Sequence, residues 1–404
     1  YSLYLNYLQR EEETLKKLVS ILLVLIMTVS LFGCAGTSTG SGAAAPETIK
    51  IGVTLPISGQ SAIAGEYMKN GIELIVDQLK AEGGLDVKGK KMQVEFLYED
   101  NEAKPETTAN AYRKLIDQDK VIAIVGPDMS KCILAGGPIA QASKVPCIGT
   151  FTTNEKVTQI GDFVFRACFI DPFQGRVMAS YAADTLKVKT AAILYNNADD
   201  YSKGLMENFI KAFEAKGGTV VETQAYGGAD VKDFNAQLTK IKAANPEVLF
   251  MPNQFGEVPL QMKQARQMGI TAQFLGGDSW DSPDVPNIAG VDIVEGAAYD
   301  AAFSPVDPNP VCQDFVKRYK DKYGVNPNSN AVLAYEAALV VLEGVKNAET
   351  LNGQGVRDAM AKITNFPVPS GTITFDETRN PVKGAVINVY KNGQPDYVTT
   401  VNPN

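Results

Sequence analysis

The chain has 404 residues, of which 45% are hydrophobic and 21% are charged, as in ordinary globular proteins. Its formal charge of −8, without basic runs interleaved with aromatic residues, argues against nucleic acid as a partner. The sequence contains no histidine, which removes the commonest general base and the usual ligand of catalytic zinc. We therefore predict two or three domains and a protein that is not an enzyme, with no catalytic residues, metal site or cofactor.

The N-terminal segment has the pattern of a targeting sequence. Lys16 and Lys17 precede an apolar stretch at 18–32, which is followed by Gly33 and Cys34. This stretch is shorter than the roughly 20 apolar residues that a helix needs to span a bilayer. It resembles a bacterial lipoprotein signal, in which cleavage makes the cysteine the lipid-modified N-terminus. We predict a leader and signal peptide at 1–33 and lipidation of Cys34.

Two further expectations concern this region. Residues 34–47 are rich in Gly, Ser, Thr and Ala and predict a flexible tether, which places the mature protein at the outer face of the cytoplasmic membrane. Residues 1–14 precede the basic residues and match no part of a signal peptide. We hypothesise that natural initiation is at Leu15, which N-terminal sequencing of the unprocessed precursor would check.

Strand and helix patterns alternate from Thr48 onward. The first series predicts strands at 49–55, 92–98, 121–125 and 145–148, and helices at 65–80, 105–118 and from about 130 to 143. Apolar strands separated by helices form a parallel sheet with helices on both faces. These residues predict the first lobe of a two-lobe α/β protein.

Polar residues follow two of these strands where the apolar runs break. The strand at 121–125 ends at Gly126 and leads to Ser130, and the strand at 145–148 ends at Gly149 and leads to Thr153. Parallel strands end at one edge of a sheet, where a helix N-terminus offers unpaired N–H groups to an anion. We predict that Ser130, Thr153 and neighbouring backbone hold a small carboxylate. The alternative for Ser130 is a role only in capping the helix.

A second series has the same design. It predicts strands at 190–195, 219–226, 248–251 and 274–275, and helices at 172–186, 201–215, 233–244 and 258–268. Three helices at 311–323, 330–347 and 355–363 and two strands at 371–375 and 385–390 follow. We expect these helices to pack on lobe one and the final strand to join lobe two. Lobe one is then 48–171 plus 300–380, and lobe two is 172–299 plus 381–404.

Four cysteines follow Cys34, at 132, 147, 168 and 312. An even number outside the cytoplasm permits two disulfides, but the spacing gives no framework and no CxxC motif. We interpret them as buried thiols that pack as small hydrophobic side chains.

The order of motifs along the mature chain resembles the type I periplasmic-binding-protein family, specifically the leucine/isoleucine/valine-type amino-acid-binding proteins of ABC transporters. The residues that carry the resemblance are Ile51 to Gly59, Gly83-Gly84-Leu85, Tyr98-Glu99-Asp100, Gly126 to Ser130, Phe165-Arg166, Asp171 to Gly175, Gln264-Ala265-Arg266, Gly276-Gly277-Asp278 and Thr374-Phe375-Asp376. The resemblance covers the chain from about Thr48 to its end. It implies two doubly wound parallel-sheet lobes joined by crossovers, which close on a ligand.

The resemblance also implies roles for individual residues. Ser130 and Thr153 stand where the family binds the α-carboxylate of an amino acid, and the Phe151 carbonyl where it accepts from the α-ammonium. Asp278 stands at the position of the carboxylate that pairs with this ammonium, and Tyr201 at that of the closing aromatic residue of lobe two. A zwitterion needs such neutral donors on one side and one acceptor-only carboxylate on the other.

Other positions leave alternatives open. Asp171, at the first crossover, is a candidate for a water-bridging role, and Trp280 either walls the cleft or fills a core. Asp278 has the alternative of a turn residue, because Asp281 and Asp284 lie close by in sequence.

The sequence departs from the family where the ligand side chain is expected to bind. Ala64 and Gln254 stand where the leucine-type proteins carry aromatic residues. The resemblance therefore implies that this chain binds an α-amino acid, and branched-chain amino acids are only candidates for the ligand.

The resulting interpretation is a monomeric, lipid-anchored solute-binding protein. It would capture an amino acid and deliver it to an ABC permease and its ATPase subunits. The main alternative is a sensory receptor of the same fold for an amide or related small molecule. Glycoside hydrolysis by the carboxylates near Trp280 is the least favoured interpretation, because such clusters usually form solvated loops.

Overall fold

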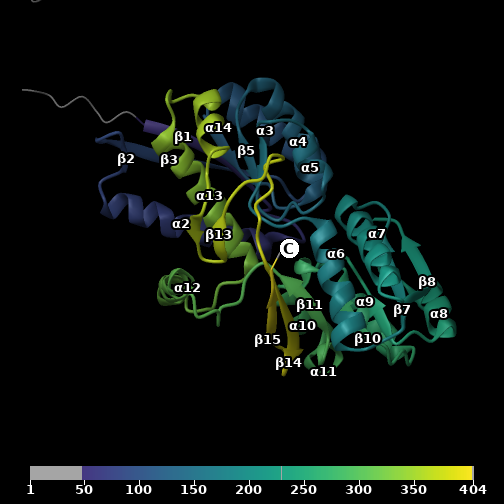
Figure 1. The fold of residues 1–404 in the computed structure, drawn as a ribbon. Helices are drawn as coiled ribbons and strands as arrows, with labels where there is room; N and C mark the ends of the chain where they lie inside the picture. The colour runs from purple at the N-terminus through teal and green to yellow at the C-terminus, as the bar shows by residue number, and fades with distance from the viewer. Residues whose placement is uncertain (1–47, 229, 403–404) are drawn as a thin grey trace, which may run out of the picture. The chain divides into compact units, whose positions relative to one another are not determined.

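The structure is a computed structural model that describes residues 48–228 and 230–402, which belong to one compact unit. Two large sheets organise these residues, each with helices packed on it (Figure 1). Both are mainly parallel with antiparallel strands at an edge, so the predicted two-lobe α/β fold is confirmed. The predicted leader, the tether and Cys34 lie outside the described residues.

The first sheet has the strand order β2-β3-β1-β4-β5-β6. Its strands are β1 (Thr48–Leu55), β2 (Leu85–Val87), β3 (Lys90–Asp100), β4 (Ala123–Val125), β5 (Cys147–Gly149) and β6 (Val164–Arg166). Its helices are α2 (Ala62–Ala81), α3 (Pro105–Arg113), α4 (Ser130–Ser143) and α5 (Lys156–Gln159). Four adjacent strands run parallel to one another: β1, β4, β5 and β6. The strands β4 and β5 therefore end at the same edge of the sheet, as their sequence pattern predicts.

The second sheet has the strand order β15-β14-β11-β10-β9-β7-β8. Its strands are β7 (Thr190–Asn196), β8 (Thr219–Tyr226), β9 (Val248–Phe250), β10 (Gln273–Gly276), β11 (Ala298–Ala301), β14 (Ala385–Lys391) and β15 (Gln394–Val401). Its helices are α6 (Asp171–Ser180), α7 (Asp200–Ala215), α8 (Asn235–Ala244), α9 (Val258–Gln267), α10 (Asp284–Ala289) and α11 (Val291–Val294), with a 3₁₀ turn, η4, at Asp278–Trp280. The strand β14 pairs antiparallel with β11 and so belongs to this sheet.

The antiparallel strands arise from two tight hairpins. Lys88-Gly89 joins β2 to β3 and Asn392-Gly393 joins β14 to β15, and all four of these residues have positive φ. Two-residue turns of this kind fit the twist of paired antiparallel strands. Each hairpin therefore adds an antiparallel pair to a sheet that is parallel elsewhere.

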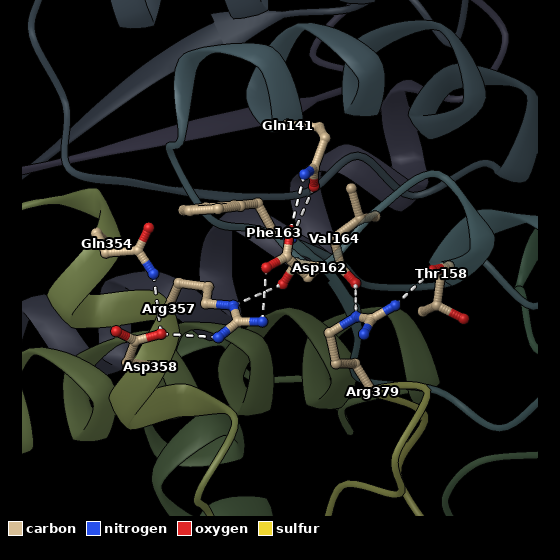
Figure 2. Close-up of polar contacts among 9 residues, drawn as sticks. All are labelled: Gln141, Thr158, Asp162, Phe163, Val164, Gln354, Arg357, Asp358 and Arg379. Atoms are coloured by element: carbon tan, nitrogen blue, oxygen red, sulfur yellow. Dashed lines mark hydrogen bonds and ion pairs between the residues drawn. The ribbon is translucent and has the colours of Figure 1, made fainter.

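The late helices α12 (Pro310–Tyr323), α13 (Ser329–Asn347) and α14 (Gly353–Met360) pack on lobe one, with α13 against α2 (Figure 1). Figure 2 shows how Arg357 and Arg379, from the C-terminal part of the chain, contact the segment from α5 to the start of β6. Arg357 of α14 donates to the Asp162 carboxylate at 2.7 Å and to its carbonyl at 3.1 Å. Arg379 donates to the carbonyls of Thr158 at 2.6 Å and Val164 at 3.2 Å. A short pair, β12 (Phe366–Val368) and β13 (Gly371–Ile373), follows α14.

Three segments connect the lobes, at 167–170, 302–309 and 374–384. Lys383 of the third segment is held on both sides: its ammonium forms a buried ion pair with the Glu336 carboxylate of α13, and it donates to the Ala167 carbonyl of the first segment at 3.2 Å. Ser370 donates to the same carboxylate through its N–H at 2.7 Å and its hydroxyl at 3.0 Å. Buried charges need such multiple partners, so these contacts fix the segments where they pass each other.

Two further sequence expectations can be checked on the described residues. Cys132, Cys147, Cys168 and Cys312 are buried free thiols, so the interpretation as small core residues is confirmed. Within 48–228 and 230–402, every helix is too short or too polar to cross a membrane.

Candidate functional site

A cavity lies where the carboxyl ends of the strands of both sheets meet. Its lining combines residues of lobe one, which are Asp128, Met129, Ser130, Phe151 and Asn330, with residues of lobe two, which are Tyr201, Gln254, Phe255, Asp278 and Ser279. Its volume is about 20 Å³, which is room for about one water molecule. The lobes are therefore closed on each other here, and a larger ligand enters only when they separate.

The lobe-one wall is formed by the ends of β4 and β5. Gly126 directly follows β4 with φ of +96°, and a Cβ at this position would lie 2.2 Å from the Thr54 carbonyl oxygen, so only glycine fits the turn. The turn leads directly into α4, whose first residue is Ser130. The Ser130 hydroxyl makes no capping bond to its own helix and instead accepts from the N–H of Asn154 at 3.2 Å. This contact holds the ends of the two strands together.

A buried arginine fixes the loop after β5. Arg166 of β6 is fully buried and donates to the carbonyls of Thr152 at 2.6 Å and Asn154 at 2.8 Å. Thr153 lies between these two residues, and its buried hydroxyl has no partner among the described residues. The loop therefore presents Phe151 and Thr153 in a fixed conformation.

The lobe-two wall depends on a chain of side-chain contacts. Asp199 caps α7 by accepting from the N–H of Tyr201 at 3.2 Å and accepts from the Gln254 amide at 2.8 Å. Gln254 in turn accepts from the Ser279 hydroxyl at 3.1 Å, which itself accepts from the N–H of Phe255 at 3.0 Å. The loops after β7, β9 and β10 are thereby linked at the cavity.

A polar network beneath these loops supports the same wall. Asn253 accepts from the Ser202 hydroxyl at 2.8 Å and donates to the Gln261 amide oxygen at 2.9 Å. Asn196 donates to the Glu257 carboxylate at 2.9 Å. Burial, and secondarily the charge of Asp199, raises the pKa of Glu257 to about 7.

Buried carboxylates gather at one end of the cavity. Asp278 and Asp300 are both buried, and the Gln174 amide bridges them when its NH₂ group is turned toward them, donating at 3.2 Å to Asp278 and 3.1 Å to Asp300. Burial and the charge of Asp171 hold the pKa of Asp278 well above its usual range. Burial likewise raises the pKa of Asp171 to about 7, although the Arg166 charge opposes the rise. A cation in this cluster would find acceptors and few competing positive charges.

The structure brings together Ser130, Phe151, Tyr201, Gln254 and Asp278 in the cavity lining. Thr153 and Asp171 are buried beside it, where the N–H of Asp171 donates to the Thr153 carbonyl at 2.9 Å. Of the nearby aspartates, Asp281 binds the N–H of Ser329 at 2.7 Å and lies outside the lining, while Asp284 begins α10. Asp278 is therefore the aspartate of this loop that lines the cavity.

Trp280 is not part of the cavity lining. Its indole is fully buried in the lobe-two core, packs closely against Gly276 and donates to the Met251 carbonyl at 3.2 Å. Of the two interpretations left open by the sequence, the structure places this residue in the core.

Sequence reasoning missed several residues of the site. Asp128, Asn330 and Ser279 line the cavity, and the Gln174 amide bridges Asp278 to Asp300 from outside the loop of Asp278. The position of Asp128 could have been predicted from the sequence, because this residue lies between the end of a strand and Ser130. Asn330 and Asp300 come from distant segments, and their approach depends on the crossovers.

Comparison with known proteins decides the family. A model of the family described as periplasmic binding protein matches residues 48–394. The chain belongs to the periplasmic binding protein family. Its members are substrate-binding proteins and not enzymes, as the sequence predicts.

Individual relatives of this periplasmic binding protein cover almost all of the folded chain. A leucine-, isoleucine-, valine-, threonine- and alanine-binding protein of Pseudomonas aeruginosa is 28% identical over 351 residues, which are 86% of this chain and 90% of the relative. The crystal structure of a leucine-binding protein, LivK, of Thermotoga maritima has a TM-score of 0.82 at 35% identity, covering 88% of this chain and 99% of that protein. The branched-chain amino-acid-binding protein LivJ of Streptococcus pneumoniae, in complex with isoleucine, has a TM-score of 0.82 at 31% identity, covering 88% and 100%.

Proposed function

We propose that this protein binds an α-amino acid between its lobes and delivers it to an ABC importer. The observation that carries the proposal is that Ser130 of lobe one and Asp278 of lobe two line the same cavity. The N–H groups at the start of α4 and the Ser130 hydroxyl suit a carboxylate, and Asp278 suits an ammonium group. Such a ligand bridges the lobes and stabilises the closed state by contacts that the open state lacks.

The relatives indicate where a ligand search should begin. Leucine, isoleucine, valine, threonine and alanine are the ligands named for the Pseudomonas protein. A thermal-shift screen of the twenty amino acids would identify the ligand, because a ligand that binds only the folded state raises its apparent stability. An absence of any stabilisation across this set would remove the amino-acid assignment.

Two substitutions test the clamp itself. We expect Ser130→Ala and Asp278→Asn each to weaken binding of the identified amino acid by about 1–3 kcal/mol, because each leaves a buried partner of the ligand unpaired. Isothermal titration calorimetry measures the change. Ser143→Ala, at the exposed end of α4, and Asp292→Asn, on the exposed surface of lobe two, are the matched controls and should bind like the wild type. Unchanged affinity in both clamp variants would remove these residues from the site.

We further propose that lipidation of Cys34 anchors the protein at the outer face of the cytoplasmic membrane. The support is the sequence pattern before Cys34 together with the following tether. A Cys34→Ser variant expressed in a bacterial host should move from the membrane fraction to the soluble extracytoplasmic fraction. Equal membrane association of the variant and the wild type would contradict the anchor.

A further inference from the structure

The cavity lining separates into two groups with different chemistry. Ser130, Phe151, Tyr201 and Asp278 face the carboxylate and ammonium groups in the proposed clamp. The remaining lining residues, which must surround the ligand side chain, are Asp128, Met129, Gln254, Phe255, Ser279 and Asn330. Four of these six are polar, whereas a pocket for an aliphatic side chain is lined mainly by apolar groups.

Two of the polar residues already have partners in the protein. Gln254 binds Asp199 and Ser279, and the Ser279 hydroxyl also accepts from the N–H of Phe255. These contacts hold the side chains in place and use much of their hydrogen-bonding capacity. They therefore shape this end of the cavity more than they select a ligand.

Asp128 differs, because it is buried and incompletely paired. Its side chain is 4% exposed, and its Oδ1 atom accepts no hydrogen bond from any described residue. It does not cap α4, which has Met129 at its N-cap position and no side-chain capping bond. Burial raises the pKa of Asp128 to about 6, so at neutral pH the carboxylate is mostly ionised. A buried ionised oxygen beside a ligand cavity requires a donor.

Asn330 adds a second polar group from another part of lobe one. It lies in the first turn of α13 and is 8% exposed, and its side-chain amide makes no hydrogen bond within the described part of the chain. An amide offers both N–H donors and a carbonyl acceptor. Met129 and Phe255 supply apolar walls, so the subsite combines an acceptor, an amide and apolar surface for the hydrocarbon part of a side chain.

We infer that the bound amino acid carries a hydrogen-bond donor, an O–H or N–H group, on its side chain and that the Asp128 carboxylate receives this donor. This inference rests on the proposed function, since it assumes the amino-acid clamp. The preferred ligands are then amino acids with a hydroxyl, amide or cationic side chain. An aliphatic side chain would leave the Asp128 oxygen buried and unpaired, which binding sites built for a donor reject strongly.

The test compares ligands of matched shape on the wild-type protein by calorimetry. Threonine and valine have almost the same shape and differ by a hydroxyl against a methyl group, and glutamine and leucine extend the comparison to an amide. We expect the better polar ligand to bind at least about tenfold more tightly than its aliphatic counterpart. Equal or tighter binding of valine and leucine would overturn the inference while leaving the clamp in place. If none of the twenty amino acids binds, the proposed function itself fails.

A variant then assigns the preference to Asp128. Asp128→Leu should remove the preference for the polar ligand or reverse it, while Asp117→Leu, at an exposed position of lobe one, should keep it. An unchanged preference in a folded Asp128→Leu protein would contradict the role of this carboxylate. If the variant does not fold, as a thermal melt would show, the comparison on the wild type still decides the inference.

Discussion

Burial changes the protonation of the acidic residues around the cavity. Asp171 has a raised pKa because it is buried and, secondarily, because Asp199 and Glu155 are negatively charged, and the pKa of Asp278 is raised by burial and by the charge of Asp171. Asp300 is affected in the same way by burial and by Asp278. In the proposed clamp, the α-ammonium group of a ligand would relieve this repulsion, so a cluster that is unfavourable for folding would favour binding.

The raised pKa of Glu257 makes the stability of the protein depend on pH. Its pKa is about 7 in the folded protein, above the ordinary 4.5, so between these pH values the folded state holds a proton that the unfolded state releases. Its contribution to stability is therefore fully present below pH of about 4.5 and is lost as the pH rises through about 7. Glu257→Gln removes this titration and keeps an acceptor for Asn196.

Between pH 5 and pH 8, the free energy of unfolding of the wild type should fall by about 1–3 kcal/mol relative to that of Glu257→Gln. The wild type loses the contribution of protonated Glu257 over this range, whereas the variant has no group to titrate at this position. Urea denaturation at the two pH values measures this difference. Glu214→Gln, on the exposed side of α7, is the control and should follow the wild type. A difference between Glu257→Gln and the wild type that stays constant with pH would contradict the assignment.

The sequence predicts which lobe-one residues lie together at the cavity, because their position depends on local features. Ser130 and Phe151 follow strands whose apolar pattern and glycine breaks mark their ends, and parallel strands must end together. Asp278 and Tyr201 required the resemblance to a family. Asn330 and Asp300 could not be placed by either route, since the crossovers and helix packing bring them to the cavity from distant segments.

At the scale of whole elements, the alternation of strands and helices was predictable and the irregular parts were not. Helices α3 and α6 each end in a π-helical turn, Lys114–Gln118 and Tyr181–Thr185, which hydrophobic periodicity does not distinguish from an α-helix. The Asn392-Gly393 dipeptide is a strong signal for a two-residue hairpin and predicts the missed strand β15. The three-residue strands β2 and β12 are too short for an alternating pattern to be recognised.

Two glycines at the end of β10, Gly276 and Gly277, make space for neighbouring side chains. A Cβ at Gly276 would lie 2.0 Å from the Trp280 ring, and one at Gly277 would lie 2.4 Å from the Tyr201 hydroxyl. Trp280 can therefore fill the core directly below the strand end while Asp278 and Ser279 line the cavity above it. The core position of Trp280 is part of the mechanism that positions Asp278.

At the scale of the whole molecule, contacts between the lobes surround the cavity. The Asn154 amide of lobe one donates to the Asp200 carbonyl of lobe two at 2.8 Å, and Asp281 of lobe two accepts from the N–H of Ser329 of lobe one at 2.7 Å. With room for about one water molecule in the cavity, these contacts must open for an amino acid to enter. A ligand that bridges Ser130 and Asp278 would then compensate for the lobe contacts that are lost.

A crystal structure of the protein with its tightest-binding amino acid tests the central claim most directly. We expect the ligand carboxylate within hydrogen-bond distance of the Ser130 hydroxyl and the first N–H groups of α4, and the ammonium group against the Asp278 carboxylate. Density for the ligand outside this cavity, or a ligand whose ammonium group lies at Ser130, would contradict the account.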